Sequence, residues 1–313
     1  MPKLVVAIGG NSLITDKDHQ TVEDQYLAAG ATAHHIATLI EDGWDVAVSH
    51  GNGPQVGSIL RRSELARHEL HEVPLDACVA DTQGAIGYAL QQNLDNDLRR
   101  AGIEREVATV VTQVEVDPHD PAFLNPGKPI GPFFNEEEAA ERRSVDGWDV
   151  REDAGRGWRR VVASPHPLRI VELGVVKTLL DAGVVVITVG GGGIPVVPDE
   201  HGNLKGVPAV IDKDHASALL AGNINADMFL ISTAVEKVAL HWGTADQRFV
   251  DRFTLDQVKE HLEEGTHFAE GSMAPKMRAV VSFLENGGSE ALITNPDSLE
   301  KAIAGETGTR IVH

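Results

Sequence analysis

The sequence has almost no cysteine and no long hydrophobic run. Among its 313 residues the one cysteine is Cys78, so no disulfide can form within the chain, and this usage fits a reducing compartment. Cys78 lies in an apolar helical stretch, which favours a core position over a nucleophile. The longest apolar runs are far too short to span a bilayer. Because Met1 leads at once into a strand pattern, we expect no secretion signal and a cytoplasmic location.

Basic residues are scarce. The chain holds 27 Lys and Arg against 47 Asp and Glu, which gives a formal net charge of −20. Nucleic acid and anionic membranes both require a basic surface, so neither is expected as a partner. Hydrophobic residues make up 42% and charged residues 24%, which is enough for a full core in one large or two ordinary domains.

Several standard site motifs are also missing. No Gly-x-x-x-x-Gly-Lys-Ser/Thr loop occurs, and Gly51, Gly53 and Gly57 form only an imperfect dinucleotide fingerprint. His68 and His71 lie three residues apart on a predicted helix, but no third metal ligand accompanies them, so a solvated face is the better interpretation. The sequence therefore predicts no metal held by side chains in the site.

Strand-like and helical patterns alternate along the chain. This alternation is typical of a doubly wound α/β fold with a mostly parallel sheet. Buried strands are expected at 4–8, 46–49, 107–112, 184–189 and 228–232, and helices near 22–42, 54–70, 76–101, 166–182 and 214–222. Towards the end we expect a helix capped by Thr254 and running to about Glu264, a helix that starts after Pro275 and stops at Asn286, and strands at 291–294 and 310–312.

The stretch 117–162 breaks this alternation. It is rich in proline, glycine and charge, and a structureless insert of this length inside a compact domain is improbable unless it is functional or a small subdomain. We interpret it as an inserted lid, with a disordered surface loop as the alternative. Five aromatic residues supply apolar material for docking such a lid: Phe123, Phe133, Phe134, Trp148 and Trp158.

Glycine turns follow three of the expected strands. They are Gly9-Gly10-Asn11, His50-Gly51-Asn52-Gly53-Pro54 and Gly190-Gly191-Gly192-Gly193. Glycine leaves backbone N–H groups open to a close approach, and helix N-termini at the carboxyl ends of parallel strands attract anions. Any single turn has an ordinary connection as its alternative, but three together favour an anion-binding crevice.

Three lysines lie in turns shaped by glycine or proline. Lys128 follows Gly127, Lys213 stands between Asp212 and Asp214, and Lys276 follows Pro275. A lone lysine is usually solvated charge, but lysines in such turns are suited to neutralising phosphoryl oxygens, with the carboxylates orienting them.

These motifs together resemble the carbamate kinases of the amino acid kinase family. The resemblance runs in order along essentially the whole chain and includes Lys128-Pro129-Ile130-Gly131-Pro132, which is particular to carbamate kinases, whereas the glycine turns are shared more widely. The other matching segments are Gly9–Asn11, His50–Gln55, Thr112–Pro118, Gly190–Pro195, Val210–Asp214 and Gly271–Lys276.

The resemblance implies an αβα sandwich with two lobes. An N-terminal lobe, 1–200, would hold carbamate or carbamoyl phosphate and carry the lid at 117–162, and a C-terminal lobe, 201–313, would hold ADP or ATP with Mg²⁺. The implied reaction is reversible phosphoryl transfer between ATP and carbamate, used for ATP synthesis in arginine or agmatine catabolism. The resemblance also implies a homodimer.

The same resemblance assigns site residues. Lys213 and Lys276 would flank the phosphoryl group in transit, Lys128 would arrive as the lid closes, and Asp212 and Asp214 would orient the lysines. Substrate oxygens would be held at the glycine turns, by Gly9, Gly10, Asn11, Gly51, Asn52, Gly191 and Gly192. Nucleotide would contact Thr233, Ala234, Val235, Met273 and Lys276, with a plain strand–helix loop at 233–235 as the alternative.

Two positions depart from the wider family. Acetylglutamate kinase and its relatives carry a lysine on the first strand where this chain has Ala7, which favours a carbamate kinase; relatives often have Asp where this chain has Ala234. Three alternatives stay open: another kinase of the family acting on a different small acid, a non-catalytic sensor of carbamoyl phosphate or nucleotide, and a dinucleotide-dependent dehydrogenase. The retained lysines argue against the sensor, and the poor fingerprint argues against the dehydrogenase.

Overall fold

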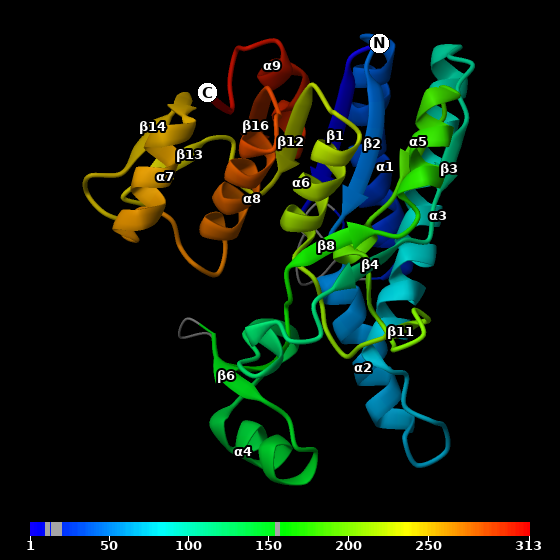
Figure 1. Ribbon diagram of the computed structural model, residues 1–313, viewed down its shortest axis with the longest axis vertical. Coiled ribbons are helices and arrows are strands. Elements are labelled where there is room, and N and C mark those ends of the chain that lie inside the picture. Colours follow the sequence, from blue (N-terminus) through cyan, green and yellow to red (C-terminus); the bar gives the residue numbers. More distant parts are fainter. Residues whose placement is uncertain (10–12, 14–20, 154–156) are drawn as a thin grey trace.

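The fold is built on one eight-stranded sheet (Figure 1). The computed structural model describes residues 1–9, 13, 21–153 and 157–313. All adjacent strands run parallel except β16 and β17, as predicted for a mostly parallel sheet. In spatial order the strands are β15 (Arg252–Thr254), β17 (Thr309–Val312), β16 (Glu290–Thr294), β12 (Met228–Ser232), β1 (Lys3–Ile8), β2 (Asp45–His50), β9 (Val185–Ile187) and β3 (Val107–Thr109).

Helices cover both faces of this sheet. Leu4, Val6 and Ile8 of β1 join one core with α1 (Val22–Glu41), α3 (Leu75–Ala101) and α9 (Leu299–Ile303). Val5 and Ala7 point to the opposite core, as alternate residues of a strand must. That core contains α5 (Leu173–Asp181), α6 (Lys213–Asn223), α7 (Leu255–Glu264) and α8 (Met273–Glu285). The αβα sandwich is confirmed.

A second sheet of four strands was not predicted. Its order is β11 (Leu204–Gly206), β10 (Ile194–Pro198), β4 (Gln113–Val116) and β8 (Pro167–Ile170). The helix predicted over 166–182 was wrong in its first part, because Ile170 pairs with Val114 of β4 and α5 begins only at Leu173. The strands predicted at 107–112 and 184–189 are shorter than expected, since the chain leaves the main sheet after Thr109 and Ile187.

The insert at 117–162 is a small subdomain that projects from the sandwich (Figure 1). A short 3₁₀ turn, η2 (Pro121–Phe123), precedes β5 (Lys128–Phe134), α4 (Glu136–Val145), β6 (Val150–Glu152) and β7 (Trp158–Val162), and the three strands form a sheet in the order β5-β7-β6. Ile130 and Val162 pack in one cluster with Val56 of α2 (Gly53–Ala66) and with Cys78 of α3. The docked cluster rules out the surface-loop alternative and confirms Cys78 as a core residue.

Arginines cover the aromatic side chains of this subdomain. Phe134 and Trp148 lie with ring centroids 6.1 Å apart, and the Arg142 guanidinium lies 5.9 and 5.2 Å from these two centroids. The Arg160 guanidinium lies 4.6 Å from the centroid of the Trp148 ring. Cation–π contacts therefore supplement the purely apolar docking that the sequence predicted for these rings.

The C-terminal elements agree closely with the predictions. Thr254 caps α7 through a capping box, while α8 begins at Met273, three residues before the start expected after Pro275, and stops before Asn286. A hairpin of β13 (Val238–Leu240) and β14 (Arg248–Val250) follows β12, and a 3₁₀ turn, η4 (Pro296–Ser298), follows β16.

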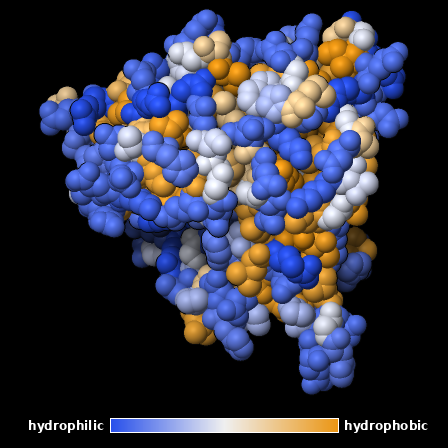
Figure 2. All heavy atoms as spheres, turned by 45° about the horizontal axis from the view of Figure 1, so that its top comes forward, coloured by the Kyte–Doolittle hydropathy of each residue, from blue (hydrophilic) through white to orange (hydrophobic). Residues whose placement is uncertain are grey.

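One face of the molecule is mainly polar. Most of the face drawn in Figure 2 is hydrophilic, with apolar residues gathered in smaller patches, as a chain of this charge predicts. Within the described ranges, no helix combines the length and the apolar character that crossing a membrane requires.

Candidate active site

The five predicted catalytic side chains come together at the start of α6. Asp212 is the N-cap of this helix, Lys213 and Asp214 are its first residues, and Lys276 lies in the first turn of α8. Lys128 is the first residue of β5, so the subdomain contributes one lysine to the group. Helices α6 and α8 pack side by side, which explains how residues 62 positions apart meet.

Asp214 binds two of the three lysines. Its Oδ1 accepts a hydrogen bond from Lys213 Nζ at 2.6 Å and its Oδ2 accepts one from Lys276 Nζ at 2.8 Å. The carboxylate is only 4% exposed. Burial alone would raise the pKa of Asp214, but the two ammonium groups outweigh burial and hold that pKa far below its ordinary value. Asp214 is therefore an ionised support between two cations.

Asp212 joins the helix start to the subdomain. Its Oδ1 accepts from the N–H groups of Asp214, at 2.9 Å, and His215, at 3.4 Å, while its Oδ2 accepts from Lys128 Nζ at 2.5 Å. Burial opposes ionisation of this carboxyl as well, and the Lys128 ammonium more than compensates, so the pKa of Asp212 is lowered. One carboxylate thus caps α6 and holds the subdomain lysine.

Lys213 is the most enclosed of the three cations. Its side chain is 12% exposed, against 15% for Lys276 and 32% for Lys128. Burial lowers the pKa of Lys213, and the neighbouring Asp214 carboxylate opposes that shift. An enclosed ammonium on a fixed partner is the preorganised charge that developing phosphoryl oxygens require.

The four-glycine block lies between the turn at Asn52 and the start of α6. A Cβ on Gly191 would lie 2.0 Å from Nδ2 of Asn52, and one on Gly192 would lie 2.5 Å from the carbonyl oxygen of Ile211, next to Asp212. Both glycines also have positive φ, 66° and 95°. No other residue type fits this close approach, so the block holds the Asn52 turn against the start of α6.

Two of the predicted anion-binding turns are already hydrogen-bonded. The N–H of Gly9 donates to the Ser232 carbonyl at 3.0 Å, and the N–H of Gly51 donates to the Ile8 carbonyl at 2.9 Å. These two N–H groups extend the pairing of β1 with its neighbours and are not free to donate to substrate oxygens in this structure, while the assignment of Gly9 and Gly51 to substrate binding stays a prediction. Gly10 and Asn11 lie outside the described residues.

The predicted nucleotide segment lies directly beyond β12, beside the Gly9 turn. A Cβ on Gly9 would stand 3.0 Å from the Ser232 oxygen and 3.8 Å from the Cα of Thr233. Ala234 is exposed, and Thr233 and Val235 are half-buried. Met273 begins α8 and packs against the core three residues before Lys276. The predicted nucleotide contacts thus lie on two chain segments, one directly after β12 and one at the start of α8.

Sequence reasoning missed Gln83. This buried side chain on α3 donates to the carbonyls of Thr112, at 3.0 Å, and Gly190, at 2.9 Å, and accepts from the Thr112 N–H at 2.7 Å. It joins Thr112, which directly precedes β4, to the glycine block. A glutamine among apolar residues of an amphipathic helix was the available signal.

His50 was also missed. The imidazole is 1% exposed, and burial lowers its pKa to about 4, so the ring is neutral near pH 7. A Cβ on Gly190 would lie 2.3 Å from its Nε2. The ring therefore packs under the glycine block as a neutral wall of the site.

Comparison with known proteins gives one consistent family. The model of the amino acid kinase family matches residues 2–295. The carbamate kinase-like protein YahI of Escherichia coli is 51% identical over 99% of this chain and 98% of its own length. The carbamate kinase of Thermococcus kodakarensis is 46% identical over 100% and 99%. A solved structure of carbamate kinase from Giardia lamblia bound to AMP-PNP is 40% identical, covers 99% of this chain and 98% of its own, and superposes with a TM-score of 0.91.

Proposed function

Because the chain belongs to the amino acid kinase family, we propose that it is a carbamate kinase, which transfers a phosphoryl group reversibly between ATP and carbamate. The chain is a kinase enzyme that acts on small molecules and binds ATP or ADP, on full-length similarity to proteins of that activity. The observation that carries the choice of reaction is the group of three lysines held by Asp212 and Asp214.

The geometry suits in-line transfer. An anionic carbamate oxygen attacks the γ-phosphorus of ATP, the bond to the bridging oxygen breaks, and ADP leaves with that electron pair. Charge accumulates on the phosphoryl oxygens, which Lys213 and Lys276 neutralise from positions fixed by Asp214. Carbamate oxygen is already anionic, so no strong general base is needed. Lys128 completes the set from the subdomain, which acts as the lid that excludes water.

Each of the two lobes would bind one of the two substrates. We place carbamate or carbamoyl phosphate in the N-terminal part, 1–200, near Asn52 and the glycine block at Gly191 and Gly192. Nucleotide would lie against 201–313, at Thr233, Ala234 and Val235, with Met273 and Lys276. The eight-stranded sheet supports this division, because β1, β2, β9 and β3 form one side and β12, β16, β17 and β15 the other.

Mg²⁺ would enter with the nucleotide. Asp214 is occupied by two lysines. Asp212 is 18% exposed, and within the described parts of the chain Lys128 is the one partner of its Oδ2. The residues therefore fit a water-mediated contact from Asp212 to an ion held mainly by phosphate oxygens. When bound, the ion neutralises phosphate charge. The site needs no side chain dedicated to it.

The test is ATP formation from carbamoyl phosphate and ADP with Mg²⁺, with acetyl phosphate and aspartyl phosphate in parallel. We expect turnover with carbamoyl phosphate alone. Lys128→Ala, Lys213→Ala and Lys276→Ala should each lower turnover by roughly 10²–10³-fold, the typical cost of one preorganised charge contact. Lys3→Ala is the matched control. The Lys3 side chain is 32% exposed, as that of Lys128 is, but Lys3 begins β1 and so lies at the end of the strand away from the proposed site.

Two outcomes would overturn the proposal. Comparable turnover with acetyl phosphate would indicate that the substrate is another small acid. Ligand binding without turnover would favour a non-catalytic sensor of carbamoyl phosphate or nucleotide. Full turnover in a folded Lys213→Ala variant would refute the mechanism while leaving the substrate in place.

Three further features are proposed from the resemblance. They are a homodimer, a cytoplasmic location and ATP synthesis in arginine or agmatine catabolism. Light scattering on the purified chain tests the dimer, and growth on arginine or agmatine as energy source with and without the gene tests the pathway.

A further inference from the structure

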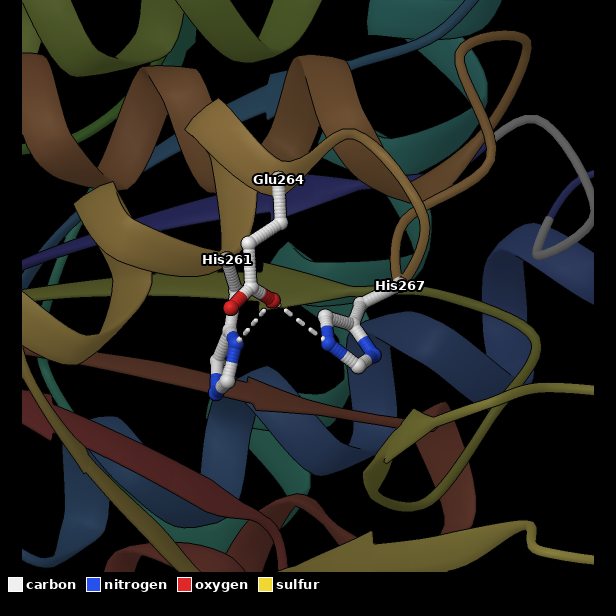
Figure 3. A group of neighbouring side chains, drawn as sticks. All are labelled: His261, Glu264 and His267. Carbon is white, nitrogen blue, oxygen red and sulfur yellow. Dashed lines mark hydrogen bonds and ion pairs between the residues drawn. The ribbon is translucent and has the colours of Figure 1, made fainter.

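A compact group of metal-type ligands lies where α7 ends. His261, Glu264 and His267 place one nitrogen or oxygen each within 4.8 Å of one another. Figure 3 shows both imidazoles directed at the Glu264 carboxylate. His261 Nδ1 lies 3.2 Å and His267 Nε2 lies 2.7 Å from the same atom, Glu264 Oε2. Three potential ligands therefore already converge on one point.

The local backbone explains the convergence. His261 and Glu264 are three residues apart on α7, so they share one face of the helix. Gly265 then ends the helix with φ 67°, a left-handed conformation that glycine adopts without strain. The chain turns back over that face and brings His267 to Glu264. The group escaped the sequence-based search because a helix end interrupts the spacing.

The surroundings favour an ion over a simple surface ion pair. The His267 side chain is 9% exposed and His261 is 17% exposed. Nδ1 of His267 is buried with no hydrogen-bond partner in the described parts of the chain, so an ion on Nε2 would break no bond outside the group. Phe253 and Phe268 flank His261 at ring-centroid distances of 5.8 and 6.2 Å, and the His241 ring lies 4.4 Å from the His267 ring, so aromatic rings enclose the group.

We propose that His261, Glu264 and His267 form a binding site for a borderline divalent transition metal such as Zn²⁺, separate from the Mg²⁺–nucleotide site. Two imidazoles and one carboxylate are a known ligand set for tetrahedral Zn²⁺, with water as the fourth ligand. The ion takes the place of the two protons that the imidazole nitrogens share with the carboxylate, and these protons pass to solvent. Mg²⁺ prefers six oxygen ligands and does not fit this set.

Binding here would act on the segment that leads to α8. Six residues after His267, Met273 begins α8, and Lys276 follows in its first turn. An ion bridging α7 and His267 would fix the entry to that helix. The consequence for catalysis rests on the proposed function, but the metal site itself does not.

The experiment is Co²⁺ titration of the untagged, EDTA-treated full chain, without nucleotide, followed by visible ligand-field absorption. We expect one Co²⁺ per chain with the intensity of a tetrahedral site, displaced by Zn²⁺ and unaffected by excess Mg²⁺. His261→Ala and Glu264→Gln should each weaken binding by more than about 100-fold, beyond the loss seen for outer-shell changes. Both positions are more exposed than His267, so these variants should keep the fold.

The double variant His68→Ala/His71→Ala is the matched control. It removes two exposed histidines of another helix end and should bind Co²⁺ as the unaltered chain does. Absent binding, displacement by Mg²⁺, or equal binding in the His261→Ala variant would each overturn the proposal. None of these readouts depends on kinase turnover, so failure of the metal site is distinguishable from failure of the proposed function.

Discussion

Replacing Asp214 by asparagine tests the physical basis of the lysine cluster. The change keeps the size of the side chain and one carbonyl oxygen but removes the negative charge between Lys213 and Lys276. The carboxylate is 4% exposed, and the two lysine side chains are 12% and 15% exposed. The variant would therefore leave two poorly solvated ammonium groups with no ionised partner between them.

The expected loss in the free energy of unfolding is large for a substitution that exchanges a single heavy atom. Removing one partner of a buried ion pair costs about 3–5 kcal/mol, because the remaining charge is left uncompensated. We expect the free energy of unfolding of Asp214→Asn at pH 7 to fall by about that amount. The comparison substitution is Asp181→Asn, whose carboxylate is 71% exposed and lies 3.6 Å from Lys3. A surface pair of that kind contributes about 0–1 kcal/mol.

The pH dependence of the difference follows from the lowered pKa of Asp214. A carboxyl whose pKa is depressed by folding stabilises the native state above the pKa of the unfolded chain, about 3.9, and loses that contribution below it. The difference between the parent chain and Asp214→Asn should stay constant from pH 7 to pH 5. Below about pH 3.9 it should shrink by about 1.4 kcal/mol for each pH unit.

Urea unfolding followed by circular dichroism at several pH values measures this difference. Equal slopes of the free energy against urea in the two chains are required for the comparison. A loss of less than 1 kcal/mol at pH 7, or a difference that does not shrink between pH 4 and pH 3, would refute the reasoning. Either result would mean that solvent, rather than Asp214, compensates the two lysines.

Three further predictions concern α3 and the glycine block. Gly191→Ala should abolish turnover and lower the melting temperature, because its Cβ would lie 2.0 Å from the Asn52 amide at φ 66°; a melting temperature equal to that of the parent chain would contradict the close approach. Gly84→Ala, in open space on α3, should instead raise the free energy of unfolding by about 0.5–1 kcal/mol, measured in urea, and a loss of stability there would be unexpected. Gln83→Ala should cost about 1–3 kcal/mol, since it leaves the buried Thr112 N–H unpaired and removes one of the two hydrogen bonds that the Thr112 and Gly190 carbonyls each accept, and hydrogen exchange at Thr112 should accelerate.

The candidate site was largely predictable because much of it is local in sequence. Asp212, Lys213 and Asp214 are consecutive, and a carboxylate before a helix is a standard N-cap, so their grouping needs no tertiary information. The same holds for Thr254, whose capping box spans three residues. That Lys128 and Lys276 join the group required the resemblance, since they lie 84 and 62 residues from their partners.

The failures have a common physical origin in long-range pairing. The role of Gln83 depends on hydrogen bonds to Thr112 and to the carbonyl of Gly190, which lies 107 residues away. Ile170 fits a helical period, but pairing with Val114 makes it a strand residue. Gly9 and Gly51 have the right residue type for binding anions, yet their N–H groups are used by neighbouring strands. Local pattern does not reveal which backbone groups the rest of the fold occupies.

The position of β1 in the sheet has a consequence for biosynthesis. β1 leaves the ribosome before the other described strands, but one of its two neighbours is β12, and the bond from Lys3 to Asp227 joins residues 224 positions apart. At about 5–20 residues per second, that partner is synthesised about 10–45 s later. During that interval one edge of a strand made almost wholly of apolar residues is unpaired, and such edges template aggregation. The sheet around β1 can therefore be completed only after most of the described chain has been translated.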